Sequence, residues 1–533
     1  MENPHELINQ LNRLSKLAAS NIAERQLEAG KLDRTTASWA AQAAAGDISR
    51  VDVIQRLRQR AWYEFRNNMY ANKAVRAIVS RLIGNGVSPE SIAVNPQGEP
   101  LAEFRTKARK LWDRFCREPS DLGRPGRGGI TFHELSAQVL TEVICSGECF
   151  LRLRRISKEE QAARNLRLPL TIQVIEAERV SEAAIMTEPT KDGTVIFRGI
   201  ELDADTGKRL AYHVYSRHPN HPLGDSRNYK TVRIQADEIL HVYVQQRPSQ
   251  LRGFSWLSPV LLNLRDINDY QFNELVASAV SSCIALAITR EPTSGSLGLQ
   301  ATTGGDNTDS DGNAITRIQP GTLLQLNPGE KLDGFDPNRP AKAAENFINH
   351  LLRGVAAGLP GVKSSQITGD YRASSFSSER SAENDIMPEI QSLQNWFYMS
   401  AHQPIYEAVI DTGVMAGYFG NVPNDQSGDL CLCDAVWRGP VSKSINPNQD
   451  ENASMGAIKN GTSSAQIEAA RKGHDWRKVI EENAEVYKAA IDAGLPESYA
   501  MNLIGVGVSP VDTQDEETLE AKSVATALDT GDG

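Results

Sequence analysis

A block of short strand-like runs between Phe150 and Val244 interrupts an otherwise helical sequence, and this interruption limits the folds open to the chain. The runs FLRLR, LTIQVIE, TVIFRGIEL, AYHVY and EILHVYV are rich in β-branched and aromatic residues, and clusters of Gly, Asn, Pro and Asp separate them. Apolar residues recur at helical spacing before the block, from Val51 to Ile83, and again after it. Strands grouped between helical regions predict an α+β fold.

Three helices are expected after the β-rich block. The first begins near Pro259 and is rich in small residues, which let helices approach closely. The second runs from about residue 341 to 357 and ends at Gly358-Leu359-Pro360, and a long amphipathic helix follows from near Glu379 to Gly413. Between these two helices, residues 361–378 are predicted to form a polar loop.

The two ends of the chain differ from its middle. Helical spacing of Leu7, Leu11, Leu14 and Ile22 predicts an amphipathic N-terminal helix. Residues 512–533 carry seven acids against one lysine, and this tail is predicted to be disordered. Removing its charge of −6 from the total of −10 leaves about −4, so the body lacks the basic stripe of a protein that grips nucleic acid tightly. Such a charge is still compatible with a protein past which DNA slides without being gripped.

The size and cysteine content of the chain also limit its class. Its 533 residues exceed the ~250–300 at which single cores stop growing, so several packed regions are expected. Six cysteines without metal-type CxxC pairs predict reduced, buried thiols and no zinc site. The N-terminus lacks the apolar core of a signal peptide, and the apolar run Leu275–Thr289 is shorter than the ~20 residues that cross a bilayer. No membrane association is predicted.

No enzyme motif is complete. Gly358–Ser364 resembles a phosphate-binding loop, but Val362 replaces the glycine required before Lys363, which argues against an ATPase. Asn307–Gly312 imitates half a calcium loop, yet Ile318 stands where a glutamate ligand is needed. The histidines are scattered, and the serine-rich run at 374–378 lacks the G-x-S-x-G pattern. We therefore predict no catalytic residue, no metal and no cofactor.

Several stretches, taken in order from about residue 50 to 480, are similar to the lambda-type tailed-bacteriophage portal protein family. The most specific is Ile239–Tyr243, followed by Arg247–Gly253 and Trp256, which resembles the family's lead into its first stem helix. The other stretches are Arg66–Ala71 with Leu82–Val87, Ser146-Gly147-Glu148-x-Phe150, Gln173–Val180, Pro320-Gly321, Pro328-Gly329-Glu330, Arg339-Pro340, Ala356–Leu359, Thr368–Tyr371 with Ser377-Ser378-x-Arg380, Trp437-x-Gly439-Pro440, and Ile445-Asn446-Pro447-x-Gln449. Pro360 and Phe376 depart from the family pattern, which leaves the shape of the loop between them open.

The resemblance implies an α+β ring subunit of portal type, with an α/β wing, a two-helix stem, a small α/β clip and a helical crown. The implied order is a helical N-terminal segment (1–50), wing (51–258), first stem helix (259–290), clip (291–340), second stem helix (341–359), channel or tunnel loop (360–378), wing helix and strand (379–446), crown (447–511) and acidic tail (512–533).

The resemblance also implies a function. A dodecameric ring of this chain would occupy one vertex of a capsid, and double-stranded DNA would be packaged and ejected through it without sequence-specific contacts. The implied partners are the terminase large subunit, the head-tail connector and the major capsid or scaffolding protein. Assembly would occur in the host bacterial cytoplasm, and the product would be part of the virion. The alternatives are another ring-forming head-tail connector, which is usually shorter and lacks two stem-like helices, and a packaging nuclease or ATPase.

Three cations of the expected channel loop are candidates for facing DNA, namely Lys363, Arg372 and Arg380. Against Asp370 and Glu379 they leave a weak net attraction, which suits DNA that must slide rather than stick. The alternative is that these groups are ordinary solvated loop charges or members of local ion pairs.

Overall fold

The structure is a computed structural model of the chain. It describes residues 51–95, 97–119, 122, 125–126, 128–166, 168–182, 184–186, 189–220, 230–283, 287–290, 330–333, 341–372, 375–420, 432–441, 447–474 and 476–505. Two compact units are distinguished: Arg50–Val244 with Arg252–Gly533, and Met1–Ser49 with Gln245–Leu251. In the smaller unit, Gln246 N donates to Gln250 Oε1 at 2.8 Å. The expected N-terminal helix, most of the clip and the acidic tail lie outside the described residues.

The larger unit begins with four helices, α2 (Val51–Asn67), α3 (Met69–Leu82), α4 (Ala102–Phe115) and α5 (Phe132–Ser146). The single helical run expected from Val51 to Ile83 is thus two helices. They part at Asn68, whose extended backbone lets its Oδ1 accept from Tyr70 N at 2.9 Å and Ala71 N at 3.2 Å. An asparagine at this N-cap position satisfies two amides that would otherwise lack partners.

The β-rich block forms two antiparallel sheets. One has the order β3-β2-β8, from β2 (Glu148–Arg155), β3 (Leu170–Ile175) and β8 (Ile239–Tyr243). The other has the order β4-β5-β6-β7, from β4 (Thr194–Phe197), β5 (Ile200–Asp203), β6 (Arg209–Tyr215) and β7 (Thr231–Gln235). All five expected runs contain strands, and β7 is an additional one. Short helical segments α6 (Lys158–Arg164), η2 (Ala177–Arg179) and η3 (Ala236–Glu238) connect them.

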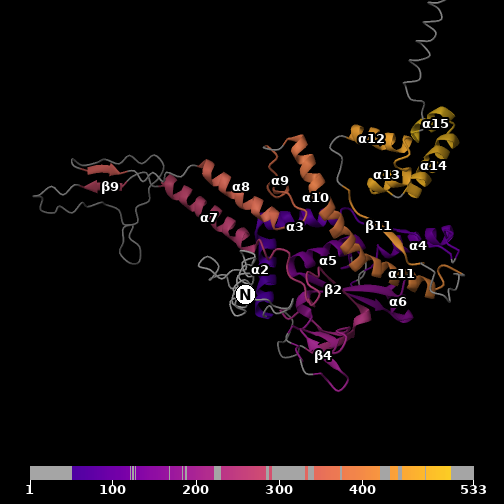
Figure 1. Cartoon of the computed structure of the whole chain (residues 1–533), viewed down its shortest axis with the longest axis horizontal. Helices are drawn as coiled ribbons and strands as arrows, with labels where there is room; N and C mark the ends of the chain where they lie inside the picture. Colours follow the sequence, from indigo (N-terminus) through magenta and orange to yellow (C-terminus); the bar gives the residue numbers. More distant parts are fainter. Residues whose placement is uncertain are drawn as a thin grey trace, which may run out of the picture. The chain divides into compact units, whose positions relative to one another are not determined.

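Two helices then lie against each other, α7 (Leu261–Cys283) and α8 (Ala341–Ala357) (Figure 1). The expectation that the first of them continues to residue 290 is wrong. After Cys283 the chain forms β9 (Ala287–Arg290), which pairs antiparallel with β10 (Glu330–Asp333). β-branched residues at Ile288 and Thr289 favour a strand once a partner strand is present, and apolar spacing alone cannot distinguish the two conformations.

The expected channel loop and the long helix after it also differ in detail from the structure. Residues 360–378 contain a short helix, α9 (Ser364–Thr368), so they are not wholly irregular. The next helix, α10 (Phe376–Phe397), starts before Glu379 because the Ser375 side chain accepts from Ser378 N and caps it. A π-helical turn, η4 (Tyr398–His402), separates α10 from α11 (Gln403–Met415).

The C-terminal part is helical, as expected. It consists of α12 (Pro447–Lys459), α13 (Ala465–Arg471), α14 (Trp476–Asp492) and α15 (Glu497–Leu503). Before it, β11 (Ala435–Arg438) pairs antiparallel with β1 (Ser88–Ser91), which joins two distant parts of the sequence.

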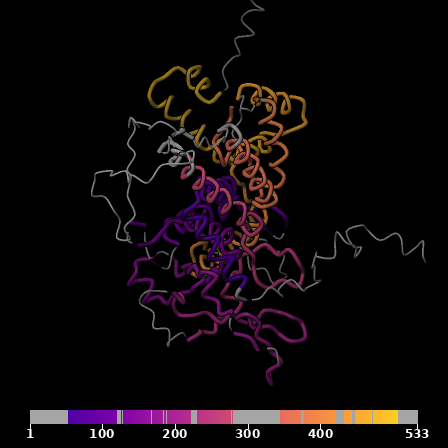
Figure 2. Tube along the Cα trace, turned by 90° about the vertical axis from the view of Figure 1, so that its left-hand side faces the viewer, coloured from indigo at the N-terminus to yellow at the C-terminus, as the bar shows by residue number. Residues whose placement is uncertain are grey.

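An aromatic core links the first helices to α11. The Trp112 ring packs edge-on against Phe132, Tyr406 and Trp437, with centroids 4.8, 5.5 and 5.7 Å apart. In Figure 2 the orange trace of this later segment passes among the indigo and purple traces of the N-terminal helices. Among the described residues, no helix combines the length and apolar content needed to span a membrane.

Candidate functional site

The segment after α8, which contains the candidate channel cations, is anchored at its start. A Cβ added to Gly358 would come within 2.5 Å of Val260 Cγ1, so only glycine lets α8 end this close to the beginning of α7. Leu359, Val362 and Ile367 are buried further along. The backbone of this segment is therefore held by apolar contacts as well as by α9.

Lys363 is paired with two carboxylates of α10. Its Nζ lies 2.9 Å from Glu379 Oε2 and 2.9 Å from Glu383 Oε2, and its side chain is only 12% exposed. Burial alone would lower the pKa of Lys363, but hydrogen bonds with Glu383 and Glu379 outweigh it and raise this pKa. The ammonium group is thus charged, yet its charge is already neutralised locally.

Arg372 is the most exposed of the three candidate cations. Its side chain is 79% exposed and bonds to Asp370 Oδ2 at 2.8 Å and to Glu345 Oε1 of α8 at 3.0 Å. Hydrogen bonds from the Arg372 side chain and backbone lower the pKa of Asp370 to about 2. Arg380, on α10, is 44% exposed and lies 3.2 Å from Asp450 of α12. Local ion pairs, one of the two alternatives for these cations, are therefore present at all three.

A cavity of about 450 Å³ lies beside Lys363. Its lining includes Arg81 of α3, Tyr371 and Glu383. Glu383 lies between Arg81 and Lys363, two cations that line the cavity, and it bonds to Arg81 Nη2 at 2.6 Å as well as to Lys363. The cavity therefore has a mixed, balanced charge rather than the single sign of an ion-binding site.

Two of the stretches that carry the family resemblance, the one at 146–150 and the one at 239–253, meet at a buried ion cluster between α2 and the β3-β2-β8 sheet. Glu148, which is fully buried, accepts from Arg58 Nη2 at 2.5 Å and from Arg252 Nε at 2.7 Å. Arg58 also bonds to Glu182, and Arg252 Nη2 lies 3.3 Å from the same carboxylate. Burial by itself would raise the pKa of Glu148, but Arg252 and Arg58 hold it well below its usual range.

Two further groups complete the bonds of Glu148. His241 Nε2 lies 2.9 Å from Glu148 Oε2, and Gly253 N donates to the same oxygen at 2.8 Å. Burial lowers the pKa of His241 to about 4, although Glu148 opposes this shift, so the imidazole is neutral near pH 7. The backbone passes so closely here that a Cβ on Gly253 would lie 2.1 Å from Gly147 O. The side chains of this cluster are buried in the interior of the larger unit.

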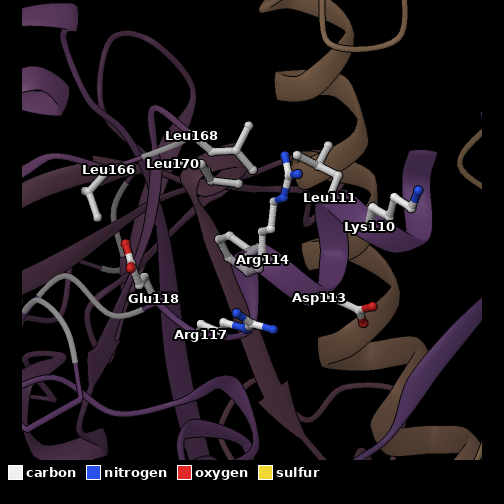
Figure 3. Close-up of a pocket in the computed structure, with 10 residues that line it drawn as sticks. Lys110, Leu111, Asp113, Arg114, Arg117, Glu118, Leu166, Leu168 and Leu170 are labelled. Atoms are coloured by element: carbon white, nitrogen blue, oxygen red, sulfur yellow. The ribbon is translucent and has the colours of Figure 1, made fainter. Parts of the chain in front are cut away.

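Further cavities lie elsewhere in the larger unit. One, of about 310 Å³, has Leu166, Leu168 and Leu170 on one side, and Figure 3 shows the Arg114 side chain extending toward Leu168 and Leu170. Arg114 Nη1 donates to Tyr418 OH at 3.2 Å. Throughout the described ranges, no group of three or more His, Cys, Asp or Glu side chains is arranged to hold a metal ion.

A larger cavity, of about 550 Å³, is lined in part by Glu142, Glu176 and Glu178. Burial and then the charge of Glu178 raise the pKa of Glu142 to about 7. Its Oε1 accepts from Ser146 Oγ at 2.7 Å, and Ser146 Oγ in turn accepts from Trp62 Nε1 at 2.9 Å. No sequence pattern pointed to this carboxyl, because an acid in a helix is ordinarily solvent-exposed.

The comparisons with known proteins agree on one family. A family model described as phage portal protein, lambda family, matches residues 32–394. The probable portal protein of Halomonas phage phiHAP-1 is 23% identical over 507 residues, which cover 94% of both chains. The portal protein of Escherichia phage N15 is 19% identical, with 91% of this chain and 93% of that one covered.

Solved structures with a similar chain include the neck of a native gene transfer agent (GTA) particle computed with C12 symmetry. The identity is 14% and the TM-score 0.42, over 82% of this chain and 97% of that chain. The neck of the empty particle, computed with C6 symmetry, gives 12% and 0.43. The family model matches more than half of the residues of this chain, and the chain therefore belongs to the lambda family of phage portal proteins.

Proposed function

We propose that twelve copies of this chain form a ring at one capsid vertex, and that double-stranded DNA enters and leaves the capsid through its centre. The observation that carries the proposal is the pair α7 and α8, which pack together and are separated in sequence by an insertion containing the β9-β10 pair. In a ring, every copy would contribute the same two helices, and helices repeated around an axis can form the wall of a channel. The family match supports the role of a structural subunit.

In this proposal the expected channel loop, residues 360–378, reaches the DNA path together with Arg380 at its edge, and the cations contribute unequally. Arg372 contributes most because it is 79% exposed, whereas Lys363, at 12% exposed and bonded to two carboxylates, mainly fixes the segment on α10. Each cation already has an acidic partner, so a passing phosphate would have to compete for it. Weak, exchangeable attraction of this kind allows sliding, because tight phosphate contacts raise affinity steeply.

The proposed partners follow from the position of such a ring. The terminase large subunit would dock on it while DNA is packaged, the head-tail connector would follow, and capsid or scaffolding protein would surround it. The ring would be assembled in the bacterial cytoplasm, become part of the virion and have no catalytic activity. Purified protein should hydrolyse no ATP, and turnover that Lys363→Ala abolishes would overturn this part of the proposal.

The channel proposal is tested by reversing the charges of Arg372 and Arg380 together, to Glu, in particles assembled with the altered chain. Native mass spectrometry should still find twelve subunits, because both side chains are partly exposed and α7, α8 and the sheets are unchanged. The amount of nuclease-protected DNA per particle should fall. The matched control is Lys191→Glu, an exposed cation in the turn before β4.

A deletion of residues 364–374 provides the complementary test. It removes α9 and Arg372 while leaving α8 and α10, so rings should form but package or retain less DNA. Particles that package and retain a full genome with either change would show that this segment does not contact DNA. A stable monomer at micromolar concentration in the unaltered protein would contradict the ring itself.

A further inference from the structure

The cavity of about 310 Å³ beside α4 combines an apolar side with a cationic one (Figure 3). Its apolar side, here called the leucine floor, lies in the segment that leads from α6 into β3 and consists of Leu166, Leu168 and Leu170. Its cationic side, here called the basic rim, comes from α4 and the turn after it and consists of Lys110, Arg114 and Arg117. The leucines are at most 9% exposed, whereas the three cations are exposed. Such a cavity fits an apolar side chain with acidic neighbours.

The charges of the basic rim are only partly neutralised. Arg114 donates to Tyr418 OH at 3.2 Å, and among the described residues the side chains of Lys110 and Arg117 form no ion pair. Two acids, Asp113 and Glu118, also line the cavity and leave it a net charge of +1. Residues 102–118 as a whole contain six bases and three acids, a net charge of +3, although the chain as a whole carries −10. Positive charge is thus concentrated at this helix.

One segment outside the described residues has the matching chemistry. Residues 515–520, Asp-Glu-Glu-Thr-Leu-Glu, place Leu519 among four acids. The acidic tail, residues 512–533, carries −6, which is opposite in sign to the basic rim and therefore attracted to it. The leucine would gain an apolar surface that this polar segment cannot supply by itself. A DNA duplex offers phosphates to the rim but no apolar side chain to the floor.

The tail is long enough to reach the cavity. Arg109, which precedes Lys110, lies 3.6 Å from Glu481 of α14. The helices α14 and α15, with 17 and 7 residues, are together about 36 Å long at about 1.5 Å per residue. Leu519 follows Gly505, the last described residue, by 14 residues, which span up to about 46–50 Å. Attachment to the same chain also raises the effective concentration of the segment at the cavity.

We propose that residues 512–521 dock on this cavity of their own chain, with Leu519 against the leucine floor and the flanking acids beside the basic rim. The contact closes the cavity and neutralises part of the positive charge of α4. Its ion pairs are exposed, so the contact is weak and reversible. A partner protein with an apolar residue among acids would compete with the tail for the same surface.

Photochemical cross-linking of the full chain tests the contact, with benzoylphenylalanine in place of Leu519. Irradiation should give products with residues 110–118 or 166–170, identified by mass spectrometry after digestion. In a mixture of unlabelled and isotope-labelled protein, both halves of each product should carry the same label, because they belong to one chain. The control position is Thr526, whose nearest acid is three residues away, and it should not give these products.

Charge reversal then tests the basic rim. In the chain with the probe at 519, Lys110→Glu with Arg117→Glu should lower the yield of these products about tenfold, because two exposed attractions become repulsions. The matched control is Lys191→Glu with Lys230→Glu, which makes the same change of charge at exposed positions that do not line the cavity. It should leave the yield unchanged. Circular dichroism should show both double variants folded, since all four side chains are exposed.

The reciprocal change is made in the tail. Glu516→Lys with Glu517→Lys leaves the rim unaltered and should lower the yield about as much as the rim variant does. Combining the two double variants restores opposite charges across the contact and should restore the yield.

Products from position 519 that lie only elsewhere in the chain, or only between chains with different labels, would overturn the proposal. A yield that neither charge reversal changes, or that the combined variant does not restore, would also overturn it. None of these measurements requires a ring, so their failure would leave the ring proposed above untouched.

Discussion

Replacing Glu148 with glutamine should destabilise the larger unit strongly, because it removes the carboxylate that two buried arginines share. Gln has nearly the same shape, so the change isolates the charge. Arg58 and Arg252 are 1% and 0% exposed, and neither can turn to solvent when the carboxylate is lost. Arg252 keeps Ala177 O and Arg198 O as acceptors, and both arginines keep Glu182. In the variant, the carboxylate of Glu182 alone balances the positive charges of the two arginines.

The expected size of the effect follows from the cost of breaking a buried pair. Removing one partner of a buried ion pair destabilises by about 3–5 kcal/mol, because the remaining charge stays unpaired in a poorly polarisable interior. For a unit as long as Arg50–Val244 with Arg252–Gly533, the unfolding entropy is so large that each kcal/mol lowers the midpoint temperature by only about 1 °C, so a decrease of about 3–5 °C is expected. The pKa of Glu148 is held well below its usual range, so this stabilisation is present above its unfolded-state pKa and is lost only as pH falls through the folded value. The difference should therefore persist from pH 8 to pH 5.

The assay is calorimetric unfolding of wild type and variant at pH 8 and pH 5. The matched control is Glu238→Gln, which breaks the pair with Arg152 on the same sheet, where the side chains are 41% and 29% exposed. A solvent-exposed pair of that kind contributes about 0–1 kcal/mol, so the control should shift the midpoint by about 1 °C or less. Equal shifts in the two variants, or a near-neutral Glu148→Gln, would show that the cluster does not stabilise the fold through its charges.

Further expectations concern single buried groups. The pKa of Glu142 is raised to about 7, so the stabilising contribution of its neutral form is complete below about pH 4.5 and is lost as pH rises through 7. In denaturant titrations, Glu142→Gln should therefore be more stable than wild type by about 2–3 kcal/mol at pH 8 and equal to it at pH 5. Burial lowers the pKa of His402 to about 3, so the folded state resists a proton that the unfolded state accepts below about pH 6.5. The unfolding free energy of wild type should therefore fall by about 2 kcal/mol between pH 6.5 and pH 5, whereas that of His402→Phe should not. Urea unfolding at the two pH values would reveal or exclude this difference. Gly253→Ala should prevent normal folding, since the added carbon would lie 2.1 Å from Gly147 O. Gly456→Ala, in helix α12 with open space at its Cβ, should be soluble and folded by circular dichroism.

Much of the fold could be predicted from the sequence, because local patterns specify most of its elements. The alternation within FLRLR or AYHVY identifies strands without knowledge of their partners. β7 was missed because Arg233 dilutes its apolar signal, and the structure shows that this arginine bonds across the sheet to Glu201 at 2.7 Å. β9 was assigned to a helix because its partner, β10, lies about forty residues further along the chain.

The candidate site was predicted less completely, since ion pairs depend on tertiary contacts. The local acids Asp370 and Glu379 were visible in the sequence, and each pairs with a cation of the segment. Glu345, Glu383 and Asp450 could not be foreseen as partners, because they reach Arg372, Lys363 and Arg380 from α8, from later in α10 and from α12. The contact of these cations with DNA remains a prediction.

The ion cluster around Glu148 also has a consequence for synthesis. Arg58 and Arg252 are 194 residues apart, so at ~5–20 residues per second Arg58 leaves the ribosome roughly 10–40 s before the chain can complete the cluster. Until Arg252 follows, the carboxylates of Glu148 and Glu182 share the single positive charge of Arg58, so this group keeps a net negative charge that resists burial. The N-terminal third of the nascent chain therefore waits with apolar surface uncovered, and such transiently exposed surface is prone to aggregation.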